Sequence, residues 1–107
     1  MNFLSIFSTS NLDDFAHSLV QDIVRRYPPE VNRESDSKNI STDKITRILE
    51  NGFKRAAIFT TENNLGYFKK ARLGNKFKWS LKDAGYNDAF VEMATEGLIV
   101  YITKIVK

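Results

Sequence analysis

Cysteine is absent from this 107-residue sequence, and histidine occurs only once. The lack of thiols excludes disulfide bonds, thiolate metal sites and cysteine nucleophiles. His17 follows Asp13 at the four-residue spacing of two ligands on one helix, but no third ligand follows at a useful spacing. We therefore expect no metal site and no cofactor.

Catalytic motifs are missing as well. None of the serines is flanked by the glycines of a nucleophile elbow. Residues 73–76, Leu-Gly-Asn-Lys, have too few glycines to form a loop that cradles a phosphate group. Nothing positive in the sequence points to catalysis, and we expect a protein that is not an enzyme.

The sequence also lacks long runs of apolar residues. The longest, Leu98 to Ile102, is far shorter than the roughly 20 residues that a membrane-spanning helix needs. The N-terminal residues lack the basic segment and the longer apolar stretch of a secretory signal. We expect a cytoplasmic protein that does not contact a membrane.

What the sequence does contain is helical periodicity in its apolar residues. One apolar stripe runs from Leu12 to Tyr27 and stops at Pro28-Pro29, which cannot continue a helix. A second helix should start at Ser41 or Thr42 and end near Glu62. Gly52 lies on its apolar face, where we expect another backbone to approach closely. The polar residues 28–42 between these helices predict a mobile loop.

The C-terminal half is less regular. We expect a break at Gly74-Asn75, a short helix from Asn75 to Ala84, and a last helix after Asn87, where eight apolar or small residues keep helical period. Residues 98–103 are also rich in β-formers, so an α+β alternative pairs them with residues 3–7 in a two-stranded ribbon. The periodicity favours an all-α fold, a single compact domain of four to five helices spanning residues 1–107.

Positive charge is concentrated in residues 67–82, where no carboxylate occurs between Glu62 and Asp83. The chain has 16 basic and 13 acidic residues. Six of the basic residues lie in this segment, and without them 10 basic residues would remain against 13 acidic ones. All the excess positive charge is therefore local, which favours an anionic partner. The candidate binding residues are Lys69, Lys70, Arg72, Lys76, Lys78, Trp79 and Lys82.

Trp79 decides how this segment is interpreted. On a helix that starts at Asn75, it lies on the outward face with Lys78 and Lys82, where a ring among cations suits base stacking and phosphate neutralisation. Alternatively, Trp79 packs under the 28–42 loop or another helix, and the lysines are solvated. Residues 76–97 loosely resemble a helix-turn-helix, but carboxylates on the second helix would repel phosphates, so only the first is expected to touch nucleic acid.

These observations favour a small, non-enzymatic binding module that contacts nucleic acid or another polyanion through residues 67–82. The alternative is a protein–protein interaction or dimerisation module of a cytoplasmic assembly, with no nucleic-acid role. It would use the apolar residues 3–7 together with Trp79, so self-association and contact with an acidic protein surface both stay open.

Overall fold

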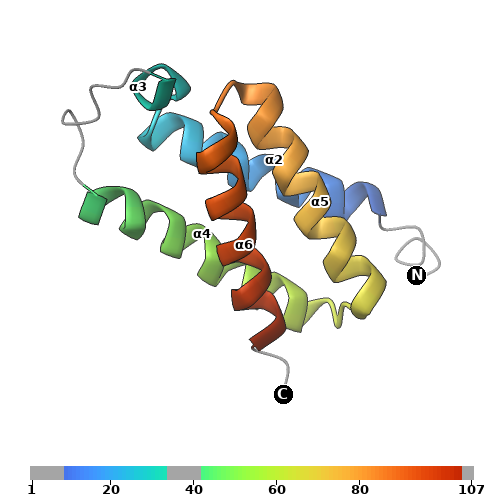
Figure 1. The fold of residues 1–107 in the computed structure, drawn as a ribbon. Coiled ribbons are helices and arrows are strands. Elements are labelled where there is room, and N and C mark those ends of the chain that lie inside the picture. Colours follow the sequence, from blue (N-terminus) through green and yellow to red (C-terminus); the bar gives the residue numbers. More distant parts are fainter. Residues whose placement is uncertain (1–8, 34–41, 105–107) are drawn as a thin grey trace.

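The computed structural model describes residues 9–33 and 42–104, and every regular element in these ranges is a helix. The all-α prediction is therefore confirmed, and the buried side chains form one cluster. The path of the chain is shown in Figure 1. The five helices are α2 (Thr9–Arg26), α3 (Pro29–Arg33), α4 (Thr42–Glu62), α5 (Tyr67–Ala84) and α6 (Asp88–Lys104).

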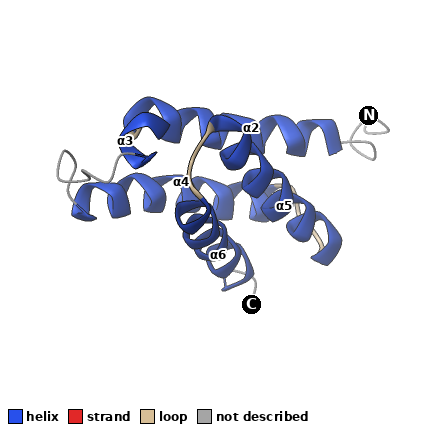
Figure 2. Ribbon diagram, turned by 45° about the horizontal axis from the view of Figure 1, so that its top comes forward, coloured by secondary structure: helices blue, strands red, loops and turns tan. Residues whose placement is uncertain are grey.

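The four long helices form two crossed layers. In Figure 2, α2 and α4 run alongside each other in opposite directions, and the α5–α6 hairpin crosses them. The main contacts join α2 to α5, α5 to α6 and α6 to α4, with a smaller contact between α2 and α4. As a result, α5 buries one face against α2 and α6 and leaves the opposite face in solvent.

Helices α2 and α4 follow their predicted apolar stripes. Leu19 and Ile23 are buried on α2, and Leu49 and Phe53 are buried on α4. The expected stop after Glu62 is also present, because Asn64 adopts the left-handed conformation with φ 56°. Asparagine tolerates this region better than most residues, so it ends a helix well.

The segment after α2 differs from the expected loop. Pro29–Arg33 forms a short helix, with Pro29 buried and Val31 packed against the core. Proline suits the first turn of a helix, because its missing N–H would have no partner there. Residues 34–41 lie outside the described residues, so the mobility predicted for the loop stays a prediction.

Helix α5 does not break at Gly74-Asn75, and this prediction was wrong. Gly74 is buried inside one continuous helix, and a Cβ placed on it would come within 2.5 Å of Ile99 Cδ1 on α6. The glycine therefore serves close packing between α5 and α6 rather than a turn. Burial of Leu73, Phe77 and Leu81 offsets its cost to helix formation, which is about 1 kcal/mol.

The close helix–helix approach that we expected at Gly52 of α4 occurs at a different glycine. A Cβ on Gly52 would be 3.9 Å from the nearest atom of Leu19, an ordinary contact with a side chain. On α6, a Cβ on Gly97 would lie 2.7 Å from Cε2 and 2.8 Å from Cζ of Phe53. The position that requires glycine for packing between α4 and α6 is therefore Gly97.

Residues 98–103 belong to α6, which rules out the ribbon alternative for this segment; residues 3–7 lie outside the described residues. Leu98 and Ile102 are both buried, one turn apart, as a helix requires.

Helix α6 starts where predicted, because the Phe90 N–H donates a hydrogen bond to Asn87 Oδ1 over 2.9 Å. Gly85, with φ 110°, ends α5 as its left-handed cap.

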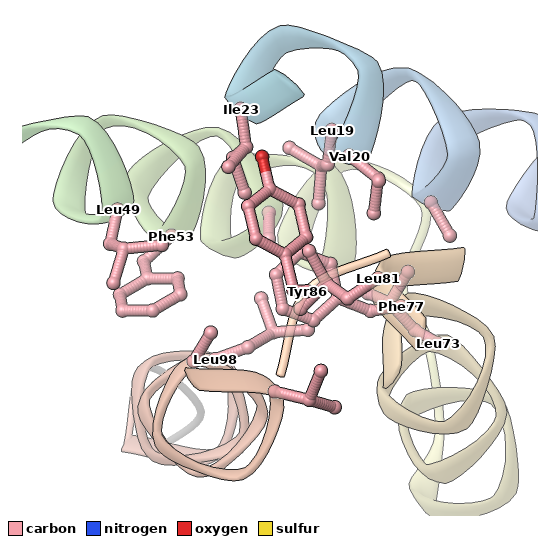
Figure 3. Close-up of a cluster of buried hydrophobic side chains, with 14 of the residues drawn as sticks. Leu19, Val20, Ile23, Leu49, Phe53, Leu73, Phe77, Leu81, Tyr86 and Leu98 are labelled. Atoms are coloured by element: carbon pink, nitrogen blue, oxygen red, sulfur yellow. The ribbon is translucent and has the colours of Figure 1, made fainter. Parts of the chain in front are cut away.

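Tyr86, in the turn between α5 and α6, is a central member of the core. Figure 3 shows its ring among Leu81, Phe77 and the α2 side chains, with the hydroxyl directed toward α2. The hydroxyl donates a hydrogen bond to the carbonyl oxygen of Tyr27, and the ring lies 4.7 Å from that of Phe90. Burial raises the pKa of the Tyr86 phenol above its ordinary value. The α5–α6 turn is thereby fixed to the end of α2.

Candidate functional site

The candidate site is the solvent-facing side of α5. Because Leu73, Phe77 and Leu81 point into the core, residues half a turn away from them point outward. The structure therefore presents most of the predicted basic residues at the surface of one helix. Arg72, Lys76, Trp79 and Lys82 are exposed, and Lys69, Lys70 and Lys78 are half-buried.

Trp79 is on the outward face of α5, with 51% of its surface exposed. The ammonium nitrogens of Lys78 and Lys82 lie over its ring, 5.9 Å and 5.5 Å from the ring centre. Such cation–π contacts hold the lysine side chains beside the indole. Trp79 is therefore not buried under another described helix, and residues 34–41 of the loop in the alternative interpretation lie outside the described residues.

Two of the six cations are paired with carboxylates. Arg72 binds Asp13 of α2 in a bidentate pair, with Nε–Oδ1 and NH2–Oδ2 distances of 3.2 and 2.9 Å. This hydrogen-bonded carboxylate raises the pKa of the Arg72 guanidinium further above its usual range. Lys82 Nζ lies 3.4 Å from Asp88 Oδ1 at the start of α6.

The other four basic residues keep their charge uncompensated by direct pairing. Within residues 9–33 and 42–104, no ion pair involves Lys69, Lys70, Lys76 or Lys78. The positive potential of the segment is therefore reduced by Asp13 and Asp88 but not cancelled. A surface of this sign attracts phosphate groups or other anions.

Two exposed aromatic residues at the start of α5 were not among the predicted site residues. Tyr67 is 80% exposed and Phe68 is 83% exposed, and their rings meet edge to face with centres 5.4 Å apart. The expected break at Gly74-Asn75 separated them from Trp79. A continuous helical register through residue 74 was the sequence signal that would have placed Phe68 on the face of Trp79.

Helix α6 presents the opposite charge beside α5. Asp88, Glu92 and Glu96 are all exposed along its outer side. Met93 and Val100 are also exposed, each at 50%, and they lie two helical turns apart on the same side of α6. Within the α5–α6 hairpin the basic residues therefore lie mainly on α5, and the expectation that only the first helix of a helix-turn-helix meets phosphates stays a prediction.

Two hollows border α5. A mostly apolar groove of about 430 Å³ lies between the first turns of α5 and the last turns of α6, and it is lined by Tyr67, Lys70, Ala71, Ile99, Ile102 and Thr103. A smaller cleft of about 230 Å³ between α2 and α5 includes His17, Ser80 and Asp83. These three residue types occur in catalytic triads, but among the described residues no hydrogen bond joins these three side chains.

The described residues offer neither a metal site nor a membrane span. In residues 9–33 and 42–104, no three His, Cys, Asp or Glu side chains come together as a metal site requires. No helix among the described residues has the length and apolar character to cross a bilayer.

Comparison with known protein families, curated proteins and solved structures found no match to this chain.

Proposed function

We propose that this protein is a non-enzymatic binding module whose outward α5 face contacts nucleic acid or another polyanion. The observation that carries the proposal is Trp79, which is half exposed and has the ammonium groups of Lys78 and Lys82 within 6 Å of its ring centre, at 5.9 and 5.5 Å. A flat ring beside two cations matches a nucleotide, which has a flat base joined to a phosphate. The proposal places this activity in the cytoplasm and assigns it no catalytic step.

The charge on the rest of α5 supports the same proposal. Lys69, Lys70 and Lys76 form no ion pairs among the described residues, so a phosphate would not have to displace a carboxylate to reach them. Each phosphate neutralised releases condensed counterions, which gives binding a characteristic dependence on salt. That dependence distinguishes a polyanion from most protein partners.

The test is binding of a labelled oligonucleotide to the full chain at several salt concentrations. Replacing both Lys78 and Lys82 with alanine should weaken binding and flatten the plot of log K against log salt, by just under one unit for each phosphate that is no longer neutralised. A matched control replaces Lys54 and Lys104, which are exposed on α4 and α6, and removes the same charge elsewhere. Absence of any binding at low salt would remove the proposal.

A second candidate is a protein-interaction or dimerisation module. The exposed apolar side chains of Phe68, Met93 and Val100 favour it, because large apolar side chains left in solvent gain from burial against a partner. A sedimentation run on the same samples measures self-association directly. If the Lys78 and Lys82 variant binds the oligonucleotide less tightly but keeps the salt slope of the parent protein, these lysines do not neutralise phosphates. An acidic protein surface then replaces nucleic acid as the proposed partner.

A further inference from the structure

Two aromatic side chains stand out along the solvent-facing side of α5. Phe68 and Trp79 are 83% and 51% exposed, and neither belongs to the core cluster. They are 11 residues apart, which in an α-helix is close to three turns and about 16 Å. Both rings therefore lie on the same side of one straight helix, at a fixed separation. This position for Phe68 depends on the continuity of α5 through Gly74.

We propose that α5 binds single-stranded rather than double-stranded nucleic acid, with one base stacked on Phe68 and another on Trp79. This inference rests on the proposed polyanion function and names the form of the ligand. Stacking on exposed aromatic rings is the usual way in which proteins hold single strands, because every base offers a π face. In a duplex those faces are covered by the neighbouring base pairs.

The residues between the two rings suit a sugar–phosphate backbone. Arg72 and Asn75 are exposed and, by helical geometry, fall on the same side of α5 as Phe68 and Trp79. The Arg72 guanidinium uses two nitrogen atoms to bind Asp13, and since it carries five N–H donors, others remain for a phosphate. Along this side of the helix, an aromatic ring (Phe68) is followed by a cation (Arg72), an amide (Asn75), a second ring (Trp79) and a second cation (Lys82).

The width of the positive surface also favours one strand. A helix with its side chains is about 10–12 Å across, and the exposed carboxylates of Asp88, Glu92 and Glu96 lie on the adjoining helix α6. One phosphate backbone can follow α5 without approaching them. A duplex presents two backbones, and a second one over α6 would meet like charge.

The separation of the rings sets a minimum ligand length. At a rise of about 3.4 Å per nucleotide the two rings are about five steps apart, so a fully stacked strand needs about six nucleotides to span them and a more extended strand needs about five or fewer. A dinucleotide can reach only one ring. Affinity should therefore increase steeply with length up to about five nucleotides and only slowly beyond that.

The experiment measures binding of the full chain to thymidine oligonucleotides of about two, five and ten nucleotides and to a duplex of about ten base pairs, at one low salt concentration. Trp79 is the only tryptophan, so quenching of its fluorescence reports stacking in every protein that retains it, and the anisotropy of a labelled oligonucleotide measures the affinity of all variants, Trp79→Ala included. Phe68→Ala and Trp79→Ala should each weaken binding of the longer strands about tenfold, the lower part of the range for one stacked base. Duplex binding should change by less than about twofold.

The matched control is Ile58→Ala, which removes an exposed apolar side chain from α4 and should leave every affinity unchanged. Equal affinity for duplex and single strand, or aromatic variants that bind single strands like the parent protein, would overturn the inference and leave the polyanion function in place. Failure of the parent protein to bind either ligand would remove both. Circular dichroism of each variant confirms that the helices are retained, so a loss of binding reports the side chain removed.

Discussion

The two faces of α5 contain the same types of residue in opposite environments. Phe77 on the inner face is 1% exposed, whereas Phe68 on the outer face is 83% exposed. The inner face is packed against α2 and α6, whereas the outer face contacts these helices only through the Arg72–Asp13 and Lys82–Asp88 ion pairs at its edges. Helix α5 thus contributes to stability through one face only, and the other can change without unfolding the protein. Aromatic content alone does not distinguish these roles; position on the helix does.

The largest expected effect compares two identical substitutions on these faces. Phe77→Ala should lower the free energy of unfolding by about 3–5 kcal/mol, because it removes a buried ring and leaves a cavity. Phe68→Ala should change it by less than about 0.5 kcal/mol, since its ring is already solvated. Urea denaturation followed by circular dichroism measures both. Equal losses in the two variants would mean that Phe68 is packed in solution.

The next prediction tests whether the inner face of α5 tolerates added volume better than α6 does. Gly97→Ala should cost about 1–3 kcal/mol, because its Cβ would meet the buried ring of Phe53. Gly74→Ala should cost less, since the clashing atom is the end of the Ile99 side chain, which can rotate. Thermal unfolding of the two variants ranks them. A larger loss at residue 74 would show that the α5–α6 contact is the less adaptable one.

Tyr86→Phe tests the anchor that orients α5. Loss of the hydrogen bond to the Tyr27 carbonyl should cost about 0.5–1.5 kcal/mol. The folded-state pKa of Tyr86 is raised, so its contribution is complete below the unfolded pKa of about 10 and is lost as pH rises above it. The parent protein should therefore lose stability in alkaline buffer, and Tyr86→Phe should lose less. Identical alkaline profiles for the two proteins would contradict this assignment.

The smallest expected change in stability is at the edge of the outer face. Asp13→Asn removes the carboxylate that pairs with Arg72, and surface pairs of this kind contribute little to folding. The freed guanidinium should instead strengthen polyanion binding and make the salt dependence steeper. Asp14→Asn, at an exposed neighbouring position, is the control for net charge. The same gain in both variants would show that only total charge matters.

Most of the fold could be predicted from the sequence because apolar spacing records which face of each helix is buried. That signal was sufficient for α2, α4 and α6, and the cap residues Gly85 and Asn87 marked the turn between α5 and α6. It failed at Gly74, since a glycine that admits a neighbouring helix looks the same in sequence as one that ends a helix. It also failed at α3, a helix of five residues that is held to the protein by the burial of Pro29 and the packing of Val31 against the core.

The candidate site was predictable only in part. Charge counting located the basic residues, and helical geometry placed Trp79 beside Lys78 and Lys82. Two features of the site were not predicted. The first is the pairing of Arg72 with Asp13, residues far apart in sequence. The second is the exposure of Phe68, whose register follows from the uninterrupted helix.

The buried glycine in the middle of α5 has one more consequence. Because Gly74 is packed against Ile99, the position where the helix would bend most easily is supported by α6. The outward side chains therefore sit on a preorganised scaffold, and their backbone loses little further freedom when a ligand arrives. Association should then proceed in a single step at a rate set by diffusion and charge, without a slower phase of backbone rearrangement.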